Sequence, residues 1–298
     1  MFRFRSSAHT PLKEVRGLKL KKRGRTTNVI PGFKSTLGIT ILMVSLLILI
    51  PLASVLVFSF RLSPGEFIKL ITAKNVVSAF KTSILCSFIA AFINSVFGLI
   101  LAWVLVKYEF PGKRILDGLI ELPFALPTAV AGITLSKMYS NTGFPGKFFS
   151  SIGIDVSYTK IGVVVALVFI GIPFTVRAVQ PVLEKLDPQY EEAAYILGAN
   201  SKTTFFKVIF PELFPSLLTG FGLALARGIG EYGSVIYISG NSAKDGTQVV
   251  SYVIMQKLER MDYASATAIA LVLLVISFTL LFVINIIQIR RAKRISAR

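Results

Sequence analysis

Long apolar blocks separated by short charged stretches are the feature that most limits what this chain can fold into. An α-helix rises about 1.5 Å per residue, so about 20 apolar residues cross the hydrocarbon layer of a membrane. Runs with few or no charges lie at 35–60, 82–106, 122–136, 161–176, 213–238 and 263–289. The third and fourth runs are short, and charged residues at their ends would have to snorkel toward the interfaces. We predict an all-α integral membrane protein with six transmembrane helices.

The positions of lysine and arginine predict the orientation of these helices. Most of the 33 lysine and arginine residues lie in the segments 1–34, 107–121, 177–212 and 290–298. Because these residues accumulate on the cytoplasmic side, we predict that both termini are cytoplasmic, in a cell inner or plasma membrane. The resulting domain organisation is a basic N-terminal tail at 1–34, a transmembrane domain at 35–289 and a basic tail at 290–298.

The net charge of +18 would point to nucleic acid if the protein were soluble. Here the surplus is concentrated in the terminal tails, with the densest run at Lys19–Arg25, where it can face anionic lipid. We therefore predict the lipid membrane as a partner and no nucleic acid. The N-terminal tail is rich in arginine and serine and poor in acids, as a transit peptide is, which leaves a plastid inner envelope open as a second location.

The chain contains few residues of the types that serve as catalytic groups or metal ligands. The one cysteine, Cys86, lies inside the second apolar run, and the one histidine, His9, lies in the basic tail. The chain alone therefore predicts no disulfide, no metal site and no catalytic residue. Gly228–Gly233 matches the dinucleotide fingerprint by letter but follows an apolar helix, and 198–203 lacks the glycine before lysine of a phosphate loop. We predict no cofactor, so an ATP-driven function would need a separate ATPase.

The segment 184–212 is polar and helix-forming in a chain otherwise built for lipid. Pro188 and the glutamates after it suit a helix N-terminus, and Gly198 suits the end of that helix. A second short helix is predicted at 203–208, ending against Pro211. The segment is interpreted as a docking surface, and an ordinary amphipathic connection is the alternative. The candidate docking residues are Glu191, Glu192, Ala193, Ala194, Gly198 and Pro211.

Two prolines, Pro123 and Pro127, interrupt the third apolar run. They remove two backbone donors, and a membrane protein tolerates such a break where the freed carbonyls are buried in protein or line a wet cavity. A half-helix beginning near Thr128 would direct its backbone N–H groups at an anion. We interpret this break as a candidate part of a translocation pathway, and a kink that only shapes packing is the alternative.

Arg227 and Glu231 are an oppositely charged pair, four residues apart, in the fifth run. On a helix over 213–238 both would lie in the middle third of the membrane, where charges are costly and functional use is the default hypothesis. Two interpretations remain open. Either the pair fixes helix packing, or Arg227 attracts a divalent anion while Glu231 keeps the arginine from trapping it.

The docking segment resembles the EAA signature of the membrane subunits of ABC importers. Its matching residues are Glu192, Ala193, Ala194, Gly198 and Pro211. Val208 and Phe210 replace an isoleucine and a leucine, and both keep an apolar residue. Most of the chain is similar to the T-type permease subunit of sulfate/thiosulfate importers, in the family of binding-protein-dependent transport system inner-membrane components. The runs that carry this similarity are Leu122–Gly132, Arg177–Glu184, Ala226–Val235 and Lys257–Tyr263.

The resemblance implies the type I importer transmembrane domain, with 184–212 as its ATPase-coupling loop. It also implies a second homologous permease, two cytoplasmic ATPase subunits and an external sulfate-binding protein as partners, so the chain would be a transport subunit and not an enzyme. A molybdate/tungstate permease, which shares the signature, is the alternative substrate class. A stand-alone anion channel or secondary transporter would explain the six spans and Arg227, but it leaves the docking segment without a task.

Overall fold

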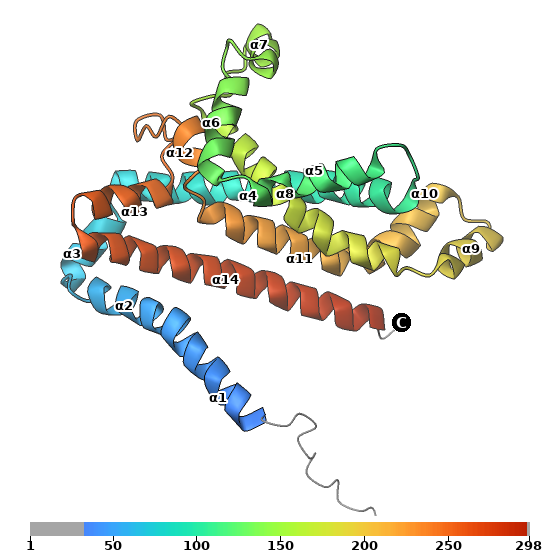
Figure 1. Cartoon of the computed structure of the whole chain (residues 1–298), viewed down its shortest axis with the longest axis horizontal. Coiled ribbons are helices and arrows are strands. Elements are labelled where there is room, and N and C mark those ends of the chain that lie inside the picture. Colours follow the sequence, from blue (N-terminus) through green and yellow to red (C-terminus); the bar gives the residue numbers. More distant parts are fainter. Residues whose placement is uncertain (1–32, 297–298) are drawn as a thin grey trace, which may run out of the picture. The chain divides into compact units, whose positions relative to one another are not determined.

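The computed structural model describes residues 33–296, and every regular element in this part of the chain is a helix (Figure 1). The basic run Lys19–Arg25 and His9 lie outside the described residues. The elements in chain order are α1 Phe33–Val44, the π-helical turn η1 Ser45–Leu49, α2 Ile50–Ser59, α3 Pro64–Ile71, α4 Lys74–Lys107, α5 Lys113–Ala125, α6 Thr128–Met138, α7 Phe144–Ser151, α8 Lys160–Glu184, α9 Pro188–Ile196, α10 Ser201–Thr204, the π-helical turn η2 Phe205–Ile209, α11 Phe210–Ile229, α12 Val235–Ile238, α13 Val250–Glu259 and α14 Tyr263–Ser296.

Membrane-spanning helices are present in the predicted number when the broken one is counted. Within residues 33–296, five helices are long and apolar enough to cross a membrane, at Ser35–Ser59, Lys74–Lys107, Lys160–Glu184, Ser201–Ile229 and Tyr263–Arg291. The sixth candidate is the pair α5 and α6, which is bent by 112° at its break. The prediction of an all-α membrane protein is confirmed. The break falls at Pro127 as predicted, whereas Pro123 lies inside α5 and does not end that helix.

The chain divides into two compact units after Leu52. In the first unit, no residue from Ser35 to Leu52 is buried, as expected for a helix whose apolar side chains face lipid. A π-helical turn, η1, precedes Pro51, and the Ile50 N–H donates to the Ser45 carbonyl five residues earlier. The wider turn moves a carbonyl away from the proline ring, so the helix continues through Pro51.

The core of the second unit is the packing of α4, α8 and α11, which Figure 1 shows running side by side. Thr175 of α8 lies between two glycines of the other helices. A Cβ added at Gly98 would stand 2.8 Å from the Thr175 Cβ, and one added at Gly220 would stand 2.7 Å from the Thr175 Cα. Such backbone approach needs small residues, which is how membrane helices pack in the absence of a hydrophobic drive between them.

Two of the predicted helix ends are wrong. The fourth span does not stop at residue 176, because α8 continues to Glu184 and carries polar residues that bond to α5. The fifth span ends at Ile229 and not at Ile238, because the chain turns through Gly230 before α12 begins. Neither end coincides with the end of the apolar run that predicted the helix.

Pro211 does not end a helix, which corrects a further prediction. The π-helical turn η2 comes immediately before it, and the Phe210 N–H donates to the Phe205 carbonyl. The proline then falls in the first turn of α11, where its missing N–H costs little. The result is one apolar helix over Ser201–Ile229.

Candidate coupling and translocation sites

The segment 184–212 forms the predicted helix, turn and helix. Asp187 caps α9 by accepting a hydrogen bond from the Gln189 N–H at 3.0 Å, and Pro188 follows in the first turn. Gly198 ends the helix with a φ of +81°, the left-handed region that favours glycine. Asn200 then caps α10 through the Thr203 N–H at 2.9 Å.

The candidate docking residues fall on two sides of this segment. Ala194 is buried, and Pro211 is half-buried. Glu192, Ala193 and Gly198 are exposed. Next to them Ile196 and Leu197 are 85% and 87% exposed, a pair of large apolar side chains at the end of a polar helix. An exposed apolar pair with polar surroundings is typical of a protein–protein contact.

Glu191 is a docking candidate whose side chain contacts α4 and so connects α9 to that helix. Its carboxylate pairs with the Lys107 ammonium, which also lies over the Trp103 ring at 5.6 Å. Trp103 packs edge-on against Phe205 of η2, with 5.3 Å between ring centroids. These contacts were not predicted from the sequence, where their one signal is a basic residue directly after an apolar run.

The break in the third span meets the turn after α11. Thr128 begins α6, as predicted, and a Cβ added at Gly233 would stand 2.2 Å from the Thr128 Oγ1. One turn further along α6, a Cβ added at Gly132 would stand 2.3 Å from the Ser234 carbonyl oxygen. The structure therefore brings together two segments about a hundred residues apart in the chain. Of the prolines, Pro127 is exposed at the break, and Pro123 is buried within α5.

Arg227 and Glu231 form an ion pair at the end of α11. Arg227 lies in the last turn of α11 and Glu231 lies just past its end, so the expected place in the middle of a helix is wrong. The Glu231 side chain is 2% exposed, and its second oxygen accepts from the Ser234 N–H at 2.9 Å and the Ser234 hydroxyl at 3.0 Å. The Arg227 side chain is 35% exposed. Both oxygens of the Glu231 carboxylate are thus hydrogen-bonded, while the Arg227 side chain stays partly exposed.

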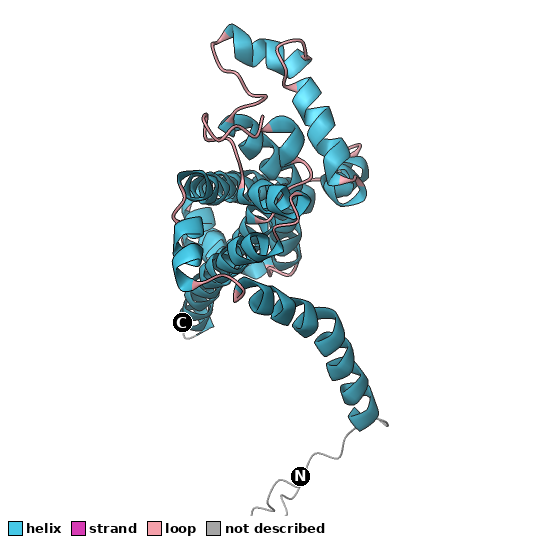
Figure 2. Cartoon of the chain, turned by 90° about the vertical axis from the view of Figure 1, so that its left-hand side faces the viewer, coloured by secondary structure: helices cyan, strands magenta, loops and turns pink. Residues whose placement is uncertain are grey.

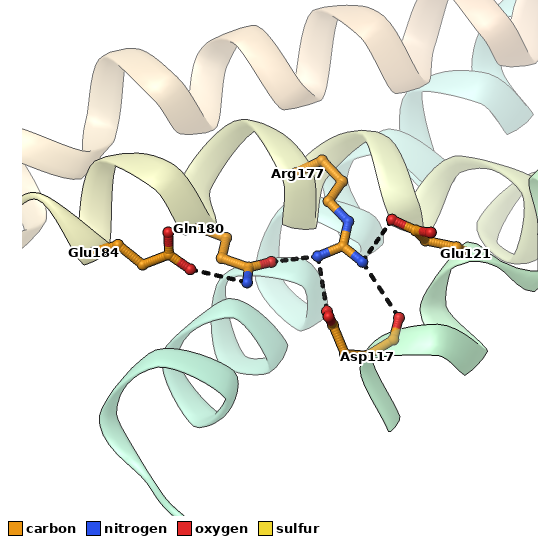
Figure 3. Close-up of polar contacts among 5 residues, drawn as sticks. All are labelled: Asp117, Glu121, Arg177, Gln180 and Glu184. Carbon is orange, nitrogen blue, oxygen red and sulfur yellow. Dashed lines mark hydrogen bonds and ion pairs between the residues drawn. The ribbon is translucent and has the colours of Figure 1, made fainter. Parts of the chain in front are cut away.

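A cluster around Arg177 joins α8 to α5 and was not predicted (Figure 3). Arg177 donates to the Asp117 carboxylate at 2.7 Å and to its carbonyl at 3.3 Å, and it pairs with Glu121 at 2.7 Å. Gln180 accepts from Arg177, and its amide donates to Glu184 at 3.0 Å. We call these five residues the Arg177 cluster. The two acids stand four residues apart on one face of α5, a spacing that the sequence showed but that identifies no partner.

Comparisons with known proteins place the fold and the family. The fold is that of ABC importer transmembrane domains: it matches the crystal structure of a bacterial ABC transporter involved in the import of the acidic polysaccharide alginate, with a TM-score of 0.72 at 16% identity, over 87% of this chain and 95% of that one. Residues 94–297 match the model of the family described as binding-protein-dependent transport system inner membrane component, and the chain belongs to this family.

Similar sequences agree with that assignment. The sulfate transport system permease protein CysT of Salmonella typhimurium is 47% identical over 90% of this chain and 96% of its own length. The protein of the same name in Synechocystis is 43% identical over 84% of this chain and 87% of its own. The predicted resemblance is confirmed, and the chain is a multi-pass membrane component of a transport system.

Proposed function

We propose that this chain is the permease subunit of an ATP-driven importer of sulfate or thiosulfate. The observation that carries the proposal is 47% identity, over 90% of the chain, to a protein named as a sulfate transport permease. At that identity the fold and the general function are shared, and relatives with sulfate in their names span bacteria and plants. A molybdate or tungstate importer, the alternative from the sequence, has no such support.

The partners that this function needs are a second homologous permease, two cytoplasmic ATPase subunits and an external sulfate-binding protein. The coupling loop 184–212 is the contact for the ATPase, with Glu192, Ala193 and Gly198 exposed beside the apolar pair Ile196–Leu197. A structurally similar transporter was crystallised in complex with a periplasmic protein, which supports an external partner. In this assembly ATP binds to the separate ATPase subunits, and the loops 107–121 and 177–212 face the cytoplasm together with both termini, as the distribution of lysine and arginine indicates.

The pathway for the anion runs past Arg227, at the point where Pro127 and Thr128 meet the turn that carries Glu231. A guanidinium in a poorly hydrated environment lowers the cost of bringing a divalent anion into the membrane. Glu231 serves as the anchor of Arg227, because its oxygens are already bonded to Arg227 and Ser234. This anchoring is compatible with the predicted role of Glu231, which is to keep Arg227 from trapping the anion.

Uptake of radiolabelled sulfate in a strain without its own sulfate permease tests the proposal. Expression of this chain with its ATPase and second permease should give ATP-dependent uptake that excess thiosulfate competes away. Competition by molybdate, with no effect of thiosulfate, would move the chain to the molybdate class. Uptake by this chain alone, driven by a proton or sodium gradient, would instead make it a secondary transporter.

A further inference from the structure

Helix α5 is held to the rest of its unit by few apolar contacts. Only Ile120 and Pro123 of α5 are buried, whereas Ile115 is 69% exposed and Leu119 is also exposed. A cleft of 530 Å³ lies beside it, lined in part by Asp117 and Gln180 of the Arg177 cluster. An element with so little buried apolar surface is easily displaced, so the polar contacts of Arg177 carry much of its attachment.

Both helices that the Arg177 cluster joins are weakened by proline close to it. Pro123 stands two residues after Glu121 in α5, and Pro181 stands one residue after Gln180 in α8. Proline cannot donate to the carbonyl four residues before it, which for Pro181 is the carbonyl of Arg177. Helices bend most easily at such positions. The Arg177 cluster therefore lies close to the positions where α5 and α8 bend most easily.

The Arg177 cluster also lies between the two sites of the proposed function. Glu184, at one end of the cluster, is the last residue of α8 and the first residue of the coupling loop. Asp117 and Glu121, at the other end, lie on α5, which leads through Leu126 into α6 at the translocation break. We propose that Arg177 is a positioning residue that transmits movement of the coupling loop to α5 and α6. The inference rests on the proposed roles of the loop and the break.

The chemistry of Arg177 suits this role better than a lysine would. Its planar fork binds Asp117 and Glu121 together while a further bond reaches Gln180, which a lysine ammonium on a flexible stem does not reproduce. Arg177 is partly exposed, at 30% of its side chain, so water can replace a contact when α5 shifts. Multiple short contacts that water can replace allow the cluster to hold α5 in one state and release it in another.

The assembled importer in proteoliposomes provides the test, with uptake and ATP hydrolysis measured together. In Arg177→Gln the sulfate imported per ATP hydrolysed should fall about tenfold, within the range of coupling between distant sites. In Arg177→Lys the sulfate imported per ATP hydrolysed should lie between the values of Arg177→Gln and the wild type. The matched control is Arg114→Gln, an arginine of α5 that forms no ion pair among residues 33–296, and it should leave the ratio unchanged.

A second measurement needs no substrate and follows α5 directly. Spin labels at Ile115 and Val182, in a Cys86→Ala background, report the distance between α5 and α8. Arg177→Gln should shift or broaden that distance, and Arg114→Gln should not. The inference is overturned if the label distance stays unchanged in Arg177→Gln, or if it changes while the sulfate imported per ATP hydrolysed does not. It is also overturned if uptake and hydrolysis both fall in proportion to the amount of assembled complex. Failure of the wild type to import sulfate would instead contradict the proposed function, since the label distance does not depend on the anion.

Discussion

At the scale of single residues, Arg227 and Glu231 have different surroundings and therefore different tasks. Glu231 is buried and bonded to Arg227 and to both donors of Ser234, so it is a structural anchor for the turn after α11. The Ser251 hydroxyl donates to the Glu231 carbonyl at 2.6 Å, which fixes the same turn from α13. The Arg227 side chain stays partly exposed, and in the proposed function it is this side chain that meets the anion.

Replacing Arg227 by glutamine should abolish sulfate uptake while the complex still assembles. The substitution removes the positive charge that offsets a divalent anion, a contribution of several kcal/mol within a membrane. Arg260→Gln, an exposed arginine at the end of α13, serves as the control and should keep its uptake. Initial rates of uptake at equal protein levels are the measurement. Uptake near the wild-type rate in Arg227→Gln would leave the arginine with a packing role alone.

A second residue, Asp262, caps α14 and should make stability depend on pH. Partial burial acts to raise the pKa of Asp262, but bonds from Ser265 and Lys257 outweigh it and hold the pKa below the ordinary value of 3.8. The Ser265 N–H donates to its carboxylate at 3.1 Å, and Lys257 pairs with it at 3.0 Å. A lowered pKa stabilises the fold above pH 3.8, and this stabilisation is lost as the pH falls through the lower folded value.

Asp262→Ala should accordingly destabilise the protein by about 1 kcal/mol at pH 7, the usual worth of a helix N-cap. Unfolding in detergent, followed by circular dichroism across a pH series, measures the difference. The difference in free energy of unfolding between wild type and variant should disappear on acidification below pH 3.8. Asp245→Ala, in an exposed loop, provides a comparison that should show no such difference. A difference in free energy of unfolding that does not change with pH would rule out the Asp262 carboxylate as its cause.

At the scale of elements, apolar patterning predicted which segments are helices, and local polar contacts decided where they end. The broken third span was predicted because two prolines remove backbone donors regardless of context. The end of α11 was missed because it depends on how Glu231 bonds to Ser234, a contact that periodicity does not contain. Continuation of the helix through Pro211 was missed because the π-helical turn before it has no sequence signal. The Arg177 cluster was missed since its two helices are about sixty residues apart.

Coupling by the loop 184–212 should be sensitive to bulk at Gly198. Its φ of +81° disfavours any side chain, but beyond its two chain neighbours no atom of the described residues lies within 4 Å of a Cβ placed there. Asparagine tolerates that backbone region, at small cost, and leucine adds volume that only a partner would meet. Gly198→Leu should uncouple ATP hydrolysis from uptake, whereas Gly198→Asn should retain most coupling. Equal effects in both variants would assign the loss to backbone strain and not to the ATPase contact.

At the scale of the whole molecule, the second unit joins its candidate sites through a continuous set of contacts. The coupling loop is tied to α4 by Glu191 and Lys107, and α8 is tied to α5 by Arg177. The helix α6 rises toward α7 from the packed helices (Figure 2), and Thr128 and Gly132, one turn apart on α6, meet Gly233 and Ser234. In the proposed mechanism, movement of the loop reaches the break in the third span through the Arg177 cluster and α5.

Access to that break should depend on the transport state. Thr128 is half-buried against Gly233, so a small charged thiol reagent reaches Thr128→Cys only when α6 separates from the turn. In a Cys86→Ala background, the modification rate should change by about an order of magnitude between ATP-bound and nucleotide-free complex, as expected for a shift in population of about 1.4 kcal/mol. Lys244→Cys, on an exposed loop, should react at the same rate in both. Equal modification rates of Thr128→Cys in the two states would show that the break is a fixed kink. Residues that line an alternating pathway must become more and less accessible as the transporter changes state.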